Sequence, residues 1–101
     1  MAFFFCRLVA PRPDFAFTMS DGEQELMGRH VAYLTGLGDR AVVFGPVLDP
    51  DGPWGLAVFE VGDETELKRL LDDDPTIRSR AGFRYETLPM AAGVRGGVAQ
   101  S

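Results

Sequence analysis

The sequence has little of what several protein classes depend on. It contains one cysteine, one lysine and one histidine, and no apolar run approaches the roughly 18 residues that a membrane-spanning helix needs. A single cysteine excludes an intramolecular disulfide and any site with several cysteine ligands. The apolar run Met1–Cys6 is too short for a secretion signal. We therefore expect a cytoplasmic protein that does not enter a membrane.

The charge balance is acidic and argues against nucleic-acid binding. Ten lysines and arginines stand against fifteen aspartates and glutamates, which gives a formal net charge of −5. Binding to a phosphate backbone needs clustered cations that displace counterions, and this chain lacks them. One histidine among scattered carboxylates lacks the usual spacing of a metal site, and the glycines lack the spacing of a phosphate loop. We expect neither a metal nor a cofactor.

The pattern of apolar residues predicts one α+β domain. Residues 2–10, 41–44, 54–61 and 82–88 read as strands, and residues 20–36 and 63–72 read as amphipathic helices, with a short turn from Pro75. Residues 14–18 are expected to form a connection. The order strand, helix, strand, strand, helix, strand predicts a ferredoxin-like βαββαβ sandwich, in which an antiparallel four-stranded sheet carries both helices on one face. Residues 90–101 are expected to form a flexible or partner-contacting tail after the domain of residues 1–89.

The first strand carries bulky apolar side chains on both of its alternating sets. Phe3 and Phe5 alternate with Phe4 and Cys6, so one set has to face away from the helices. A patch of that size is seldom left to water. We expect a homodimer formed through the open face of the sheet, with Cys6 as a small buried apolar residue.

One pair of polar residues is a candidate for a functional site. His30 lies in an otherwise apolar helical stripe, and Asp74 precedes Pro75 at the end of the second helix. A buried imidazole without a partner costs about 1–3 kcal/mol, and Asp74 is the candidate partner. Such a pair is either a structural hydrogen bond or a general acid/base site, and Asp74 can also cap the turn that begins at Pro75.

Two further residues are candidates for substrate binding. Tyr33 follows His30 by about one helical turn, so it either lines the same pocket or packs in the core. Arg7 is the one polar residue of the first strand. It either extends to water or anchors an anion inside a barrel.

Several local signatures together resemble the YCII-related (DGPF-like) domain family. They are the Phe-rich first strand, the segment 30–34 with sequence HVAYL, Gly45-Pro46, Gly52 with Gly55, Asp73-Asp74-Pro75, and the last-strand residues Gly82-Phe83, Tyr85-Glu86 and Pro89. The resemblance extends from Phe3 to Pro89. It implies a ferredoxin-like protomer that pairs into a dimeric α/β barrel, with a His and an Asp in the active site, which are His30 and Asp74 here.

Two functions of different kinds follow from these residues. The first is a small cofactor-independent lyase or isomerase in which His30 moves a proton and Asp74 orients it. The family resemblance adds dehydrochlorination of a chlorinated aromatic ring as an example of such chemistry. The second is a non-catalytic dimeric module that binds a small ligand or a protein, with the His30–Asp74 pair as a structural bond. The two differ in whether a ring nitrogen of His30 faces a cavity.

Overall fold

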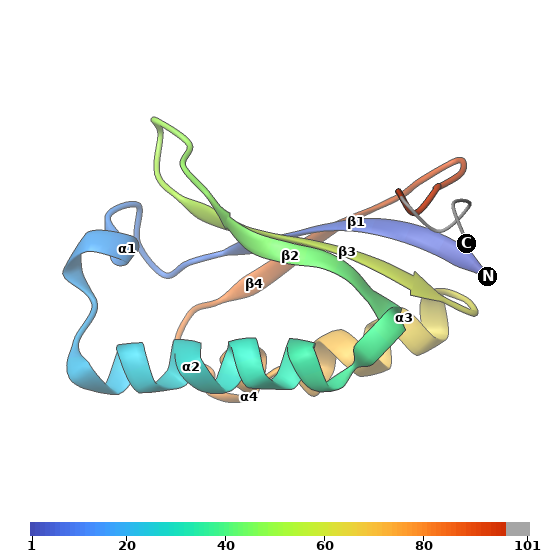
Figure 1. Cartoon of the computed structure of the whole chain (residues 1–101). Helices are drawn as coiled ribbons and strands as arrows, with labels where there is room; N and C mark the ends of the chain where they lie inside the picture. Colours follow the sequence, from blue (N-terminus) through green and yellow to red (C-terminus); the bar gives the residue numbers. More distant parts are fainter. Residues whose placement is uncertain (97–101) are drawn as a thin grey trace.

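The computed structural model describes residues 1–96, which form a four-stranded sheet with helices on one face (Figure 1). The sheet order is β2-β3-β1-β4, and every neighbouring pair of strands is antiparallel. This confirms the predicted α+β, ferredoxin-like fold. In chain order the elements are β1 (Ala2–Val9), α1 (Phe15–Thr18), α2 (Asp21–Gly36), the 3-10 turn η1 (Gly38–Arg40), β2 (Ala41–Val47), β3 (Trp54–Val61), α3 (Glu64–Asp72), α4 (Pro75–Arg78) and β4 (Arg84–Pro89).

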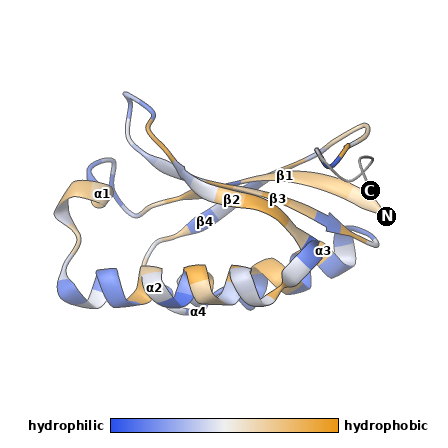
Figure 2. Cartoon of the chain, viewed as in Figure 1, coloured by the Kyte–Doolittle hydropathy of each residue, from blue (hydrophilic) through white to orange (hydrophobic). Residues whose placement is uncertain are grey.

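The core lies between the sheet and the long helices. In Figure 2 most of the central strand β1 is apolar, whereas α2 and α3 mix apolar and polar residues. Successive side chains of β1 point to opposite faces, and Phe4, Cys6 and Leu8 are buried toward the helices. They meet a core that also contains Leu34, Ala57, Phe59, Val61, Leu67, Leu70 and Leu71. Cys6 is fully buried, as predicted.

The two long helices begin where their sequences predict. The Ser20 side chain accepts a hydrogen bond from the Glu23 N–H, and the Glu23 carboxylate accepts one from the Ser20 N–H, which completes the predicted capping box of α2. At α3, the Asp63 side chain accepts from the Glu66 N–H. Capping fixes the start of α2, and the four-residue spacing of its buried residues determines which face of the helix meets the sheet. Leu26, His30 and Leu34 lie on that buried face.

Three boundaries differ from the sequence prediction. Residues 15–18 form the short helix α1 where a connection was expected. β2 continues to Val47 and so passes through Gly45-Pro46, which were expected to end it. A proline is tolerated there because β2 is an edge strand with one side free of sheet hydrogen bonds. The last strand covers Arg84–Pro89 instead of residues 82–88, because Gly82 adopts a φ of 99° and turns the chain before the strand begins.

The face of the sheet opposite the helices is partly covered by the end of the described chain. The Met90 N–H donates to the Phe3 carbonyl, and Gly93 lies against the Phe3 ring, where a β-carbon would overlap ring atoms. Arg95 donates to Glu60 at 2.9 Å and also to the Asp39 carbonyl. Residues 90–96 therefore cross one end of this face. The remainder of the predicted tail, 97–101, lies outside the described residues.

No helix within residues 1–96 is long and apolar enough to cross a membrane.

Candidate active site

His30 and Asp74 meet although 44 residues separate them in the sequence. The Nδ1 atom of His30 lies 2.8 Å from Oδ2 of Asp74 and 3.0 Å from Oδ1. Helix α2 presents His30 on its buried face, and Asp74 is the residue that begins α4. His30 is 8% exposed and Asp74 is fully buried. The contact predicted from the sequence is therefore present in a protected part of the molecule.

The Asp74 carboxylate accepts hydrogen bonds from three residues on three elements. Besides His30 on α2, the Thr76 N–H and the Thr76 hydroxyl of α4 both donate to Oδ1 at 2.9 Å. The Tyr85 hydroxyl of β4 donates to Oδ2 at 2.6 Å. A carboxylate has about four acceptor positions, and these four donors occupy them. Asp74 thus also caps α4, so the two roles weighed from the sequence coexist.

This network fixes the protonation of its members. Burial by itself raises the pKa of the Asp74 carboxyl, but the hydrogen bonds from His30, Tyr85 and Thr76 outweigh burial and hold that pKa below its ordinary value. Burial and the adjacent carboxylate raise the pKa of the Tyr85 phenol, so its hydroxyl stays a donor. Because Asp74 offers acceptors alone, Nδ1 of His30 must carry the proton in this bond. In the neutral imidazole the lone pair is then on Nε2.

A cavity of about 460 Å³ opens beside His30. Its walls come from α1, α2, the strands β1 to β3 with the β2–β3 hairpin, and the segment before β4. It is lined by Leu8, Ala10, Phe15, Ala16, Phe17, Met19, Met27, His30, Val31, Phe44, Gly45, Pro46, Leu48, Pro53, Trp54, Gly55, Leu56 and Phe83. This volume lies within the usual range of small-molecule sites, about 300–1,000 Å³.

The free nitrogen of His30 faces this cavity. Nε2 has no hydrogen-bond partner within residues 1–96, whereas every fully buried side-chain nitrogen or oxygen of those residues has one. Nε2 is therefore not fully buried, and the space that His30 lines is the cavity. A basic lone pair in an apolar pocket, backed by a carboxylate on the other side of the ring, is suited to accept a proton from a bound molecule.

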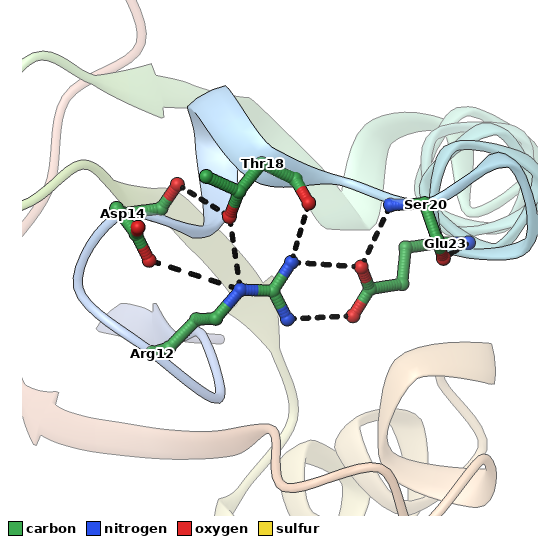
Figure 3. A network of polar contacts seen from close by, with 5 residues as sticks. All are labelled: Arg12, Asp14, Thr18, Ser20 and Glu23. Atoms are coloured by element: carbon green, nitrogen blue, oxygen red, sulfur yellow. Dashed lines mark hydrogen bonds and ion pairs between the residues drawn. The ribbon is translucent and has the colours of Figure 1, made fainter.

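An arginine fastens one wall of the cavity (Figure 3). The Arg12 guanidinium donates to both carboxylate oxygens of Glu23, at 2.9 and 2.8 Å, and also to the Thr18 carbonyl and hydroxyl. The Arg12 hydrogen bond is the main cause that lowers the pKa of Glu23 to about 2. These contacts tie the segment around α1 to the first turn of α2. Phe15 and Phe17, which line the cavity, lie within the segment held in this way.

The structure places Tyr33 and Arg7 apart from this cavity. The Tyr33 hydroxyl donates to the Leu70 carbonyl at 2.6 Å, so this side chain joins α2 to α3. Arg7 lies on the open face of the sheet, where its guanidinium carbon is 4.1 Å from the centre of the Trp54 ring and its Nε is 3.8 Å from Glu86. Neither residue is among those that line the cavity. Of the four predicted site residues, the structure brings together His30 and Asp74.

Two polar residues of the site were missed from the sequence. Thr76 follows Asp74 by two residues, and this spacing is typical of an N-cap whose side chain accepts from the next turn. Tyr85 was assigned to the correct strand, and the structure places it beside Leu8, on the side of the sheet that faces the helices. Neither the N-cap spacing nor the strand alternation predicts that the Tyr85 hydroxyl donates to Asp74.

The other reactive side chain of interest, Cys6, is not a candidate nucleophile. Burial raises the pKa of its thiol to about 12, which keeps it protonated at neutral pH. Within residues 1–96, no group of three or more His, Cys, Asp or Glu side chains is placed to hold a metal ion.

Comparison with known proteins agrees with this architecture. The model of the YCII-related domain matches residues 3–91. A similar solved structure is the 5-chloro-2-hydroxyhydroquinone dehydrochlorinase TftG from Burkholderia phenoliruptrix AC1100, in complex with 2,5-dihydroxybenzoquinone. Its TM-score is 0.65 at 19% identity, over 89% of this chain and 95% of that one. The uncharacterized protein TM1266 from Thermotoga maritima has a TM-score of 0.49 at 13% identity, over 88% and 95%. No curated protein matches the sequence.

Proposed function

The chain belongs to the YCII-related domain family, and from the site that it builds on this fold we propose that it is a small-molecule enzyme of the lyase type. In this proposal His30 is the general base and acid, and Asp74 orients the imidazole. The substrate is a compact, aromatic-like molecule that enters the apolar cavity. The observation that carries the proposal is the position of Nε2, which faces the cavity while Nδ1 is held by a buried carboxylate.

The proposed chemistry is an elimination assisted by proton transfer. In the keto tautomer of the substrate, a proton has moved from a hydroxyl group to the ring carbon that carries chlorine, so that this carbon is tetrahedral. His30 Nε2 then takes the proton of the hydroxyl group conjugated with that carbon, and the O–H electron pair forms a C=O bond, the ring double bond shifts, and chloride leaves with the C–Cl bonding pair. The net change is loss of HCl, which needs neither an oxidant nor a reductant. The imidazolium formed on His30 is stabilised by the Asp74 carboxylate 2.8 Å away. The dehydrochlorinase with a similar fold supports this choice of reaction.

A second candidate function is a non-catalytic ligand-binding or interaction module. The observation in its favour is that Asp74 links α2, α4 and β4 through hydrogen bonds to His30, Thr76 and Tyr85, as a purely structural residue would. In that case the cavity binds a ligand without changing it, and Nε2 has no chemical task.

Two variants of His30 separate these candidates. His30→Asn keeps an N–H near the position of Nδ1, so it can still donate to Asp74, but it removes Nε2. His30→Ala removes both groups and leaves Asp74 without one donor. We expect His30→Asn to fold with nearly normal stability and to release chloride from 5-chloro-2-hydroxyhydroquinone about 10²–10⁴-fold more slowly than the wild type.

Two results with these variants would contradict the enzymatic proposal. Wild-type protein that releases no chloride, or a His30→Asn variant that releases it at the wild-type rate, leaves His30 without a catalytic task. A structural pair also predicts that His30→Ala costs stability while ligand binding by His30→Asn remains unchanged. Chloride release is followed with an ion-selective electrode, and stability is followed by denaturant unfolding.

We also propose that the molecule acts as a homodimer through the open face of the sheet. The register of the strands places Val43, Val58, Phe5 and Leu88 in one row across all four strands. This row lies on the face opposite Phe4 and Cys6, and Val43 and Leu88 are 50% and 63% exposed. An apolar row of this kind, on a sheet face that residues 90–96 cover at one end, supports pairing with a second copy.

A further inference from the structure

The lining of the cavity carries no charged side chain to balance a charged ligand. No Asp, Glu, Lys or Arg is among the described residues that form its walls, and His30 is the one ionisable group. Three of the lining residues, Phe17, Val31 and Leu48, are also strongly exposed, so the rim is apolar as well. A ligand that enters therefore meets mostly apolar side chains and one ionisable side chain, that of His30.

The cations and donors in neighbouring segments are already engaged. Arg12 is bound to both oxygens of Glu23 and to Thr18. Arg7 lies against the Trp54 ring and near Glu86. Trp54 is among the lining residues, but its ring packs against Arg7 and its N–H donates to Asp49 at 3.0 Å. None of these groups is free to pair with a carboxylate or phosphate in the cavity.

Met27 occupies the position where a cation would have the greatest effect. It precedes His30 by three residues on α2, so the two side chains are neighbours on one face of the helix, and both line the cavity. A positive side chain at this position would lie beside the reacting end of the ligand. The thioether of methionine supplies apolar contact without charge.

We propose that the cavity selects an uncharged, ring-sized ligand with a weakly acidic hydroxyl group, and that Met27 sets this charge preference. The hydroxyl donates to Nε2 of His30, and the apolar walls hold the ring. Carboxylates and phosphates are rejected because burying an anion without a partner is costly. This inference rests on the proposed function, because it assumes that the ligand meets Nε2 inside the cavity.

Two probes of the same ring system test the preference. 2-Naphthol is uncharged at pH 8, and 2-naphthoate is an anion of nearly the same shape. Titration calorimetry with the wild-type chain is expected to give at least about tenfold tighter binding of 2-naphthol. In Met27→Arg, the ratio of the two affinities is expected to shift toward 2-naphthoate by about tenfold or more.

Two controls and one alternative variant keep the result interpretable. Gln24→Arg adds the same charge one turn earlier on α2, at an exposed residue that does not line the cavity, and should leave the ratio unchanged. Met27→Leu alters the side chain without adding charge and should also leave the ratio unchanged. If Met27→Arg fails to fold, Val31→Arg brings the same charge to the exposed rim and is expected to shift the ratio in the same direction.

Each contrary result has a distinct meaning. Equal binding of the two probes, or tighter binding of 2-naphthoate by the wild type, overturns the charge preference and leaves the proposed proton transfer standing. An unchanged ratio in the folded arginine variants overturns the role of Met27. Failure of both probes to bind overturns the cavity as a ligand site, and the proposed function falls with it.

Discussion

The chemistry of this molecule depends on one carboxylate that is saturated with donors. Asp74 accepts from His30, Thr76 and Tyr85, and its side chain is fully buried. Because the Asp74 carboxylate can accept hydrogen bonds but cannot donate them, the neutral imidazole of His30 has its proton on Nδ1 and its lone pair on Nε2. The hydrogen bonds around Asp74 therefore determine which atom of His30 reaches the cavity.

Tyr85 is a positioning residue in this network, and its hydroxyl can be removed alone. Tyr85→Phe takes away a hydrogen bond to an ionised group, and we expect the free energy of unfolding to fall by about 1.5–3 kcal/mol. The chloride-release rate is expected to fall as well, because Asp74 then holds His30 less firmly. Denaturant unfolding and chloride release measure the two effects.

Tyr33→Phe is the matched control, because it removes the other tyrosine hydroxyl, which donates to the Leu70 carbonyl instead of to Asp74. We expect it to lower stability by about 0.5–1.5 kcal/mol and to leave the rate unchanged. Equal effects of the two substitutions on the rate would show that the hydroxyl of Tyr85 has no special connection to His30.

Among the elements that line the cavity, α1 is short and depends on contacts with a neighbouring helix. It has four residues and no side-chain cap, and Arg12 joins its segment to Glu23 on α2 (Figure 3). We predict that Arg12→Ala increases hydrogen exchange of the amides at residues 14–18 and speeds release of a bound ligand, while exchange in β1 and β3 stays unchanged.

The control for this prediction is Arg29→Ala. Arg29 also pairs with a glutamate, Glu25, but both residues are exposed on the outer side of α2. It should leave exchange at residues 14–18 unaltered. If Arg12→Ala behaves in the same way, then Arg12 does not hold this wall of the cavity.

The long elements were predictable from the sequence because each has a local signature. Apolar periodicity identified β1, β3 and α2, and Ser20 with Glu23 marked the start of α2. Helix α1 was not predicted, because Pro11 and Pro13 make residues 11–18 resemble a loop and the contacts of Arg12 with Glu23 form only in the folded chain. The sequence likewise indicated the pairing of His30 with Asp74, whereas the cavity depends on the packing of side chains from six parts of the chain.

In the whole molecule, the open face of the sheet has no helix to cover it, and residues 90–96 reach one end of it (Figure 1). We expect the protein to sediment as a dimer. Leu88→Asp places a charge in the apolar row that crosses the four strands, and we expect it to shift the equilibrium to monomers because a buried unpaired carboxylate is costly. Sedimentation velocity measures the effect.

The control is Thr35→Asp, which adds the same charge to an exposed residue of α2, on the other side of the molecule. It should sediment like the wild type. A wild-type monomer at high concentration, or a Leu88→Asp variant that still dimerises, would contradict pairing through this face.

The proposed chemistry depends on the lone pair of His30, which lies on Nε2 and faces the cavity. Because the chain has a single histidine, a long-range ¹H–¹⁵N spectrum of the untagged, ¹⁵N-labelled protein at pH 8 reports on this ring alone. We expect a protonated Nδ1, an unprotonated Nε2, and a change in the Nε2 resonance when 2-naphthol is added. A proton on Nε2 with Nδ1 unprotonated, or an Nε2 resonance that the ligand leaves unchanged, would contradict this expectation.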